Sequence, residues 1–234
     1  MLFPPRCPLC EQILPVPADL YRNCSWEQLV CRSCREKIPW IREPVCKKCG
    51  RPIEDEMAEL CTSCERNRRP FTEGRGAVSY CREMRESVLR MKFHNHREYL
   101  DFYAAVMACA GEAYLKRIRP DAIIPVPMNI RKRRERGFDQ CRMLAQKLSA
   151  RTGIPVEKKV LFRTKNTRPQ KGLNRQQRKE NLSGAFAVKT DRELPERVLL
   201  VDDIFTTGST IEACCEALMH AGIARIYVLV LCID

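Results

Sequence analysis

Short apolar runs alternate with segments of helical periodicity along the last two thirds of the chain. The clearest run is Val-Leu-Leu-Val at residues 198–201, and similar runs occupy residues 121–126 and 224–233, the last of which we expect to close the sheet. An apolar run without polar alternation is typical of a strand buried on both faces of a parallel sheet. Further strands are predicted at residues 77–80 and 185–189.

Apolar residues at helical spacing fill the intervals between these strands. Met84, Val88 and Met91 indicate a short amphipathic helix, and a long helix is predicted over residues 98–117. Another helix is predicted from residue 138 to residue 148, and a last one from about residue 210 to the glycine stop at 221–222. Strands that alternate with helices indicate an α/β fold, in which a parallel sheet is flanked by helices.

Two carboxylates, Asp202 and Asp203, follow the run at 198–201 directly. A small hydroxylated turn comes next, and it consists of Thr206, Thr207, Gly208, Ser209 and Thr210. In a strand–loop–helix unit, a ligand lies beyond the carboxyl end of the strand, and the loop N–H groups favour a phosphate. Carboxylates repel phosphate but suit a sugar diol or Mg²⁺. The pattern predicts a phosphorylated ribose with a divalent ion, and an ordinary turn with a capped helix is the alternative.

The cysteines are concentrated near the N-terminus. Of fifteen in the chain, eight form Cys-x-x-Cys pairs, which are Cys7 and Cys10, Cys31 and Cys34, Cys46 and Cys49, and Cys61 and Cys64. Two such pairs complete one tetrahedral Cys₄ zinc site, so the spacing predicts two structural Zn²⁺ ions in a double zinc ribbon over residues 1–70. Pairing in sequence order and a cross-braced arrangement both remain open. A redox site needs only one such pair, and closed Cys₄ sites leave no position for substrate.

The first residues carry no charged-then-apolar signal, and the apolar run at residues 226–233 is far shorter than the roughly 20 residues that cross a bilayer. We therefore expect a cytoplasmic chain without direct membrane insertion. The second domain is predicted over residues 71–234.

The positive charge is concentrated in one segment. The chain has a net charge of +13, but residues 116–182 hold 20 Lys and Arg against 5 Asp and Glu, a balance of +15. Such a segment attracts polyanions such as nucleic acid or a pyrophosphate, whereas diffuse charge would indicate a solubilising surface. Two parts of it are expected to be loops, namely residues 128–137, with five basic residues in six, and the polar stretch 164–182.

All thirteen residues at 198–210 resemble the phosphoribosyl-pyrophosphate (PRPP) motif of type I phosphoribosyltransferases. The resemblance implies that Asp202 and Asp203 bind the ribose hydroxyls with Mg²⁺ nearby, and that Thr206 to Thr210 surround the 5′-phosphate. It also implies a pyrophosphate loop after residue 126 and a mobile flap at residues 164–182. The cations expected to bind pyrophosphate or a DNA backbone are Arg131, Arg133, Arg134, Arg136, Lys165, Arg168 and Lys171.

Residues 125–140 also resemble the Pro-Val-Pro to Arg-Gly-Phe-Asn-Gln signature of the ComF family, the competence-associated phosphoribosyltransferase-like proteins. Residues 167–170, 172–173 and 175–186 and the paired cysteines agree, so that the resemblance covers nearly the whole chain. It departs at Asp139, where the family usually has Asn, which puts an amide-specific contact at this position in doubt.

The family resemblance implies the handling of single-stranded DNA during natural transformation, beside a competence helicase at the membrane. The chain would then be peripheral to the membrane through this partner. The alternative is an active phosphoribosyltransferase, which transfers phosphoribose from PRPP to a nucleobase or another amine and releases pyrophosphate. The two functions are not exclusive. No stretch of the sequence identifies a hood over a nucleobase, which weakens the enzyme interpretation.

Overall fold

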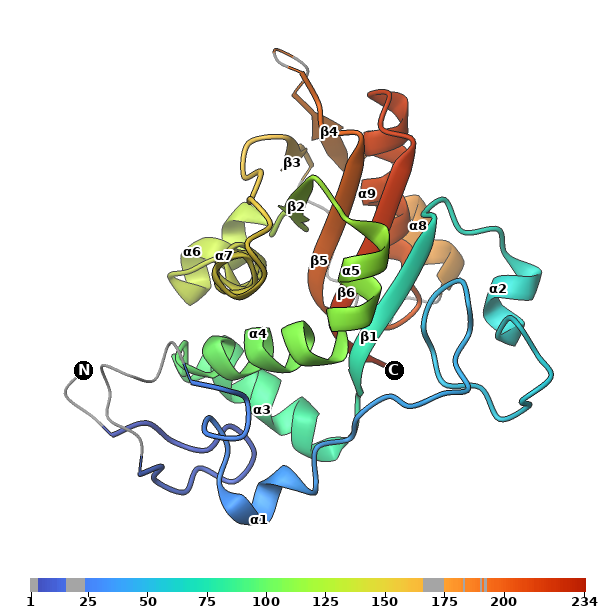
Figure 1. The fold of residues 1–234 in the computed structure, drawn as a ribbon. Helices are drawn as coiled ribbons and strands as arrows, with labels where there is room; N and C mark the ends of the chain where they lie inside the picture. Colours follow the sequence, from blue (N-terminus) through green and yellow to red (C-terminus); the bar gives the residue numbers. More distant parts are fainter. Residues whose placement is uncertain (1–3, 16–23, 166–174, 183, 190, 192) are drawn as a thin grey trace.

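A four-stranded parallel sheet forms the centre of the protein. The computed structural model describes residues 4–15, 24–165, 175–182, 184–189, 191 and 193–234. The strands follow the order β1-β6-β5-β2, and they are β1 (Glu73–Ser79), β6 (Arg225–Ile233), β5 (Arg197–Phe205) and β2 (Ala122–Pro125). The predicted parallel α/β sheet is confirmed (Figure 1). The last strand in the sequence, β6, lies inside the sheet and not at its edge, since it pairs with β5 on one side and with β1 on the other.

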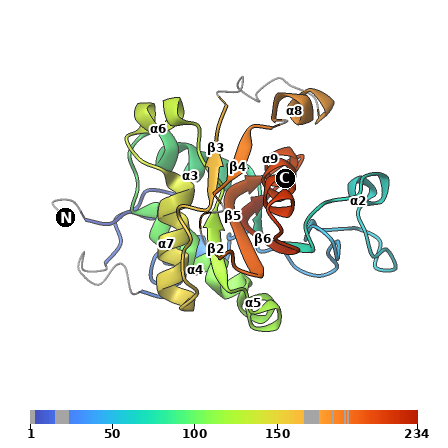
Figure 2. The same ribbon diagram turned by 90° about the horizontal axis from the view of Figure 1, so that it is seen from above.

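Helices cover both faces of the sheet (Figure 2). On one face lie α3 (Arg82–Phe93), α4 (Tyr99–Ala110) and α7 (Gln140–Thr152), and on the other lies α9 (Ser209–His220). Successive residues of β5 alternate between the two cores: Leu199 packs in the core with α4 and α7, and Leu200 packs in the core with α9. Because β5 is buried on both faces, its residues 198–201 are an uninterrupted run of apolar residues before the acid pair.

Two predicted elements differ in the structure. The helix expected over residues 98–117 is divided at Gly111 into α4 and α5 (Glu112–Ile118). Glycine destabilises the interior of a helix. A Cβ at position 111 would also lie 3.2 Å from the Leu229 side chain, so the sheet approaches the backbone closely here. The strand predicted at 185–189 is β4 (Phe186–Val188), which pairs with β3 (Leu161–Arg163) in a separate antiparallel sheet.

The two expected basic loops contain helices. Residues 128–137 fold as α6 (Ile130–Arg136), where the side chain of Asn129 accepts a hydrogen bond of 2.9 Å from the Arg131 N–H. Gly137, with a φ of 74°, ends the helix in the left-handed conformation. The stretch 164–182 contains α8 (Arg175–Leu182), while residues 166–174 lie outside the described part of the chain.

The two halves of the cysteine-rich region lie on opposite faces of the sheet (Figure 1). Cys7, Cys31 and Cys34 belong to the core with α3 and α4, whereas Cys46 and Cys64 belong to the core with α9. We call these the first ribbon, which contains α1 (Arg32–Arg35), and the second ribbon, which contains α2 (Thr62–Arg66). Each ribbon therefore contributes to a core of the α/β domain.

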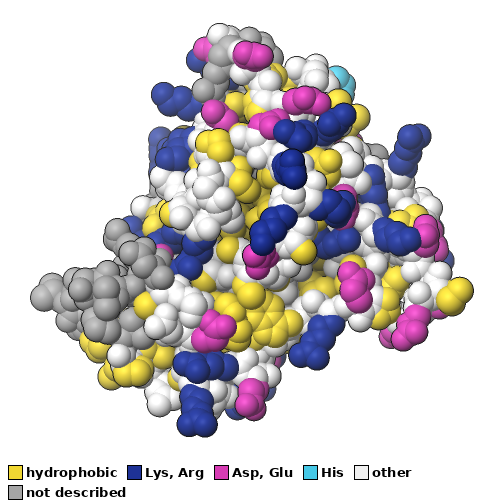
Figure 3. Space-filling model, in the orientation of Figure 1, with side chains coloured by type: hydrophobic (Ala, Val, Ile, Leu, Met, Phe, Trp, Pro, Cys, Tyr) yellow, Lys and Arg dark blue, Asp and Glu magenta, His cyan; other side chains and the backbone are white. Residues whose placement is uncertain are grey.

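The first ribbon is held against the helices by aromatic and polar contacts. Trp26 and Trp40 meet edge to face with their ring centroids 5.0 Å apart. Arg90 of α3 donates hydrogen bonds of 3.0 Å to the backbone carbonyls of Pro8 and Leu9. Figure 3 shows hydrophobic side chains (yellow) gathered in the lower centre of the molecule, between α4 and the first ribbon. Among the described helices, none is long and apolar enough to cross a membrane.

Candidate functional site

The acid pair lies at the carboxyl end of β5, inside the strand and not after it as the apolar pattern indicated. Both side chains are buried and face other polar groups. Asp203 Oδ2 lies 2.7 Å from Lys92 Nζ of α3 and accepts a hydrogen bond of 3.4 Å from Gln140 Nε2 of α7. Asp202 Oδ1 accepts one of 3.1 Å from the Cys141 thiol and one of 2.9 Å from the Asp203 N–H. Three elements therefore converge on the two carboxylates.

The two carboxyl groups differ in their electrostatics. Burial, and then the neighbouring charge of Asp203, raise the pKa of Asp202 from its ordinary value of 3.8 to about 7. Burial also opposes the ionisation of Asp203, but the ammonium of Lys92 outweighs it and lowers the pKa of Asp203 below that ordinary value. One carboxylate is thus held ionised by a lysine, and the other takes up a proton near neutral pH.

The turn after β5 has the shape that a phosphate loop requires. Gly208 has a φ of 83° and caps α9, which begins at Ser209. A Cβ at position 208 would lie 2.5 Å from an Arg69 nitrogen and 2.7 Å from the Phe205 ring, so only glycine fits. The hydroxyls of Thr207 and Ser209 are 2.9 Å apart. Backbone N–H groups at the start of a helix such as α9 are a suitable environment for an anion.

Two arginines of the second ribbon form hydrogen bonds with the backbone of this turn. Arg51 Nη2 donates a hydrogen bond of 2.9 Å to the carbonyl of Thr206, and Arg69 Nη1 donates one of 2.8 Å to the carbonyl of Thr207. Arg69, whose side chain is 1% exposed, also pairs with Glu212 of α9. The ribbon arginines therefore bind the carbonyl side of the turn, and none of the sequence patterns indicated this contact.

A cavity of about 540 Å³ opens beside the acid pair. Asp202, Asp203, Thr206 and Thr210 line it, and the cations of α6 form its other wall. The cations in this lining are Lys92, Arg131, Lys132, Arg136 and Arg163. We call this space the acid-pair cavity. Sequence reasoning did not find Lys92 or Arg163, because isolated cations in a basic chain carry no recognisable signal, and it included Lys132 only as a member of the basic run at residues 131–136.

The remaining predicted cations are distributed differently. Arg133 and Lys165 line a neighbouring cavity of about 430 Å³, and Arg134 is exposed and lines neither cavity. Arg168 and Lys171 lie outside the described residues. Thr206 and Thr207 also line an open cleft of about 1040 Å³ against the second ribbon. Apart from Arg134, the described members of the predicted basic set are therefore divided between two neighbouring cavities.

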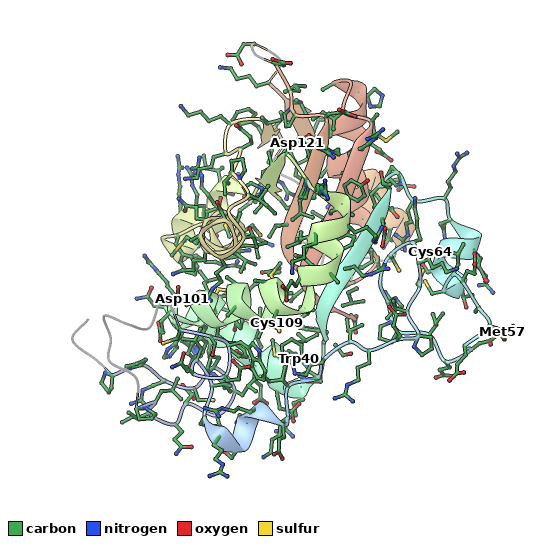
Figure 4. The ribbon with its side chains drawn as sticks, in the orientation of Figure 1. Trp40, Met57, Cys64, Asp101, Cys109 and Asp121 are labelled. Atoms are coloured by element: carbon green, nitrogen blue, oxygen red, sulfur yellow. The ribbon has the colours of Figure 1, made fainter. Side chains whose placement is uncertain are left out.

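The eight paired cysteines form two clusters in sequence order, Cys7, Cys10, Cys31 and Cys34 in the first ribbon and Cys46, Cys49, Cys61 and Cys64 in the second. Within each cluster all four sulfur atoms lie within 4.8 Å of one another, and the Cys49 and Cys61 sulfurs are 3.7 Å apart. Zn–S bonds of about 2.3 Å place tetrahedral sulfurs about 3.8 Å apart, so four thiolates and one Zn²⁺ fit each cluster. Figure 4 shows Cys64 on α2 and Met57 at the outer end of the same ribbon. The predicted structural zinc is confirmed.

Comparisons with known proteins agree with this geometry. Residues 1–65 match the family described as double zinc ribbon domain. "Competence protein F" of Haemophilus influenzae is 31% identical over 207 residues, which cover 85% of this chain and 88% of the relative. "Competence protein ComFC" of Bacillus subtilis is 26% identical over 92% of this chain and 89% of its own length. "DNA utilization protein YhgH" of Salmonella typhimurium is 28% identical over 99% of this chain and 98% of its own length.

Among solved structures, a purine phosphoribosyltransferase from Pyrococcus horikoshii Ot3 is similar, with 17% identity, a TM-score of 0.33 and coverage of 57% of this chain and 84% of that one. The family of this chain is assigned from the sequence relatives, each of which matches 85% or more of the chain. The chain belongs to the ComF family of competence-associated proteins.

Proposed function

We propose that the acid-pair cavity binds PRPP together with Mg²⁺. The observation that carries the proposal is the meeting of two buried carboxylates, a glycine turn at a helix start and several cations around one cavity. The carboxylates would accept hydrogen bonds from the ribose hydroxyls, and the N–H groups of the turn would hold the 5′-phosphate. Arg131 and Arg136 of α6 would neutralise the pyrophosphate, and Mg²⁺ would offset the charge that remains.

The larger role that we propose is the handling of single-stranded DNA during natural transformation. Three observations support it: membership of a family whose relatives are named for competence and DNA utilization, the +15 balance of residues 116–182, and the basic helix α6. The side chains of α6 apart from Arg136 are exposed, so they are available to a phosphate backbone. In this role PRPP acts as a bound ligand and is not consumed.

Phosphoribosyl transfer is the second candidate. A nitrogen nucleophile would form a bond to C1 of the ribose while the bond from C1 to the pyrophosphate oxygen breaks, and the pyrophosphate would leave with the electron pair of that bond. The nitrogen would then lose its proton to water. The open cleft against the second ribbon favours this candidate, because Thr206 lines both that cleft and the acid-pair cavity, so that an acceptor in the cleft would lie beside the turn that holds the 5′-phosphate.

Titration calorimetry with PRPP and Mg²⁺ tests the ligand assignment. We expect saturable binding to the wild type that needs Mg²⁺ and that is lost when Asp202→Asn and Asp203→Asn are combined. A pyrophosphate-release assay with a panel of nucleobases and amines separates binding from turnover. Binding without release supports the DNA-handling role, release with one acceptor supports the transferase, and no binding at all overturns the PRPP proposal.

We also propose that the protein meets a DNA-translocating competence helicase at the cytoplasmic side of the membrane. Membership of a family whose relatives are named for competence supports this proposal. Copurification of the tagged protein with the helicase from competent cells would support the proposal. Recovery of the protein without the helicase, under conditions that keep other competence complexes intact, would contradict it.

A further inference from the structure

The cavity of about 430 Å³ that adjoins the acid-pair cavity has a composition of its own. It lies between the end of β2, α6 and β3, and we call it the β3 cavity. It shares Val126, Pro127, Met128 and Arg163 with the acid-pair cavity, but neither Asp202 nor Asp203 nor any residue of the turn lines it. The two cavities are thus neighbours with a common wall.

An exposed aromatic ring is the main apolar feature of the β3 cavity. Phe162 is 40% exposed and Ile130 is 45% exposed, and both line the cavity. In β3 the neighbouring Leu161 is buried, so the alternation of the strand turns Phe162 outward. Each exposed apolar side chain is unremarkable alone, but an aromatic ring and an isoleucine in one concave basic surface offer a contact for a flat, partly apolar group.

Cations surround this apolar contact. The Lys and Arg residues of the lining are Arg133, Arg142, Lys158, Arg163 and Lys165. The one acid among the lining residues is Asp139, whose Oδ1 accepts a hydrogen bond of 3.0 Å from the Arg142 N–H at the start of α7. Because this carboxylate caps a helix, it faces backbone donors, and the cavity presents a strong excess of positive charge to a ligand.

We propose that the β3 cavity receives one nucleobase of single-stranded DNA, stacked on Phe162, while neighbouring phosphates contact Arg133, Lys158 and Lys165. A bare phosphate or pyrophosphate has no apolar surface to cover Phe162 and Ile130, and a base within a duplex would have to give up its pairing and stacking, at a cost in free energy, to enter a cavity. Aromatic stacking with cations for the backbone is the usual chemistry of single-strand recognition. The inference rests on the proposed DNA-handling function, and it places DNA and PRPP side by side with Arg163 between them.

A comparison of two oligonucleotides tests the base contact. Fluorescence anisotropy would measure the affinity of the full-length, zinc-loaded protein for a thymidine oligomer and for an abasic oligomer of equal length and charge. We expect the wild type to bind the thymidine oligomer about tenfold more tightly. Phe162→Ala should remove this preference and leave the affinity for the abasic oligomer unchanged, and Phe162→Tyr should keep the preference. Equal preference in the wild type and Phe162→Ala would overturn the proposal.

Two controls separate this inference from the function on which it rests. Met57→Ala removes an apolar side chain that is 89% exposed in the second ribbon, and we expect it to leave the base preference intact. Calorimetry with PRPP and Mg²⁺ should give equal affinities for the wild type and Phe162→Ala. Equal affinities would also show that Phe162→Ala is folded. Failure of the wild type to bind either oligomer would refute the DNA-handling function itself, whereas loss of the preference in Met57→Ala alone would assign the base contact to the ribbon.

Discussion

Arg69 of the second ribbon donates a hydrogen bond of 2.8 Å to the carbonyl oxygen of Thr207 in the turn after β5. The same guanidinium pairs with Glu212 on α9 and contacts Ser63 beside the zinc ligand Cys64. One buried cation thus joins the metal site, the turn and the helix that follows it. The second ribbon is therefore part of the support of the proposed phosphate site, and its folding and the shape of the turn are coupled.

The Arg69–Glu212 pair gives the first prediction. Arg69→Met removes the cation that pairs with the nearly buried Glu212 carboxylate, which should lower the free energy of unfolding by about 3–5 kcal/mol. Adding Glu212→Gln removes the uncompensated charge, so the double variant should recover at least about 1 kcal/mol of that loss. Urea titrations of the two single variants and the double variant give the coupling energy. If the double variant loses as much free energy of unfolding as the two single variants lose together, the two residues are not coupled and the prediction is wrong.

The contribution of the second ribbon to ligand affinity is a separate prediction. Arg51→Ala removes the hydrogen bond to the Thr206 carbonyl but none of the zinc ligands, so the zinc content should stay at two per chain. We expect the affinity for PRPP with Mg²⁺ to fall about fivefold to tenfold. The lost hydrogen bond contributes about 1 kcal/mol to keeping the turn in its binding conformation. Calorimetry checks the affinity and a colorimetric zinc assay checks the metal. Lys47→Ala, an exposed cation of the same ribbon, is the matched control.

The parts of the fold and the site that could be predicted from sequence are those that local patterns encode. The acid pair, the turn with Gly208 and the paired cysteines each occupy a few consecutive positions, and the chemistry of each pattern has few alternatives. The sequence also holds the signals for α6, since Asn129 is a good N-cap and Gly137 a good stop. The run of charges between them suggested a loop because the helix has no apolar face, and none of its residues is buried.

The parts that could not be predicted depend on contacts between distant positions. Arg51 and Arg69 bind carbonyls that lie 155 and 138 residues further along the chain. Lys92 belongs to a helix predicted only from its apolar face, and nothing in its neighbourhood marks it as the partner of Asp203. The chain contains 42 Lys and Arg, so the few that are buried beside acids cannot be distinguished by residue type. Only the packing of α3 and the ribbons against the sheet identifies them.

The raised pKa of Asp202 predicts a pH dependence of ligand binding. With a pKa of about 7, Asp202 carries a proton in acid solution and cannot accept hydrogen bonds from two ribose hydroxyls. The affinity for PRPP with Mg²⁺ should therefore rise by up to about tenfold per pH unit below pH 7 and level off above it. Calorimetry at a series of pH values checks the profile, and Asp202→Asn separates it from the titration of the phosphates. A wild-type profile equal to that of Asp202→Asn would contradict the assignment.

Stability should depend on pH with the opposite sign. The unfolded chain releases the Asp202 proton near the ordinary pKa of 3.8, whereas the folded chain keeps it until about 7. The folded state binds more protons between these values, so the contribution of this group to the free energy of unfolding decreases as the pH rises from about 4 to 7. Asp202→Asn should remove this decrease in urea titrations across the same range.

Lys92 is expected to set the charge of the acid pair. Lys92→Met removes the cation 2.7 Å from Asp203, so the pKa values of both carboxyl groups should rise and the pH profile of PRPP binding should move to higher pH. At pH 8 we expect weaker binding than in the wild type, with partial recovery at higher Mg²⁺ concentration because Mg²⁺ supplies the missing positive charge. Lys116→Met, which removes an exposed cation of α5, should leave the profile unchanged. A profile that stays in place in Lys92→Met would assign Lys92 a purely structural role.

The arginines of α6 should determine how salt affects DNA binding. Each phosphate contact that a cation makes to a single strand contributes about 0.7 to the slope of log K against log salt concentration. Replacement of Arg131, Arg133, Arg134 and Arg136 by Gln should therefore lower the slope by up to about 3 and weaken binding most at low salt. A control variant with equal loss of charge replaces four cations outside the basic segment, Lys37, Lys47, Arg82 and Arg225. Anisotropy titrations at several salt concentrations give both slopes, and equal slopes for the two variants would show that net charge, and not the position of α6, attracts the strand.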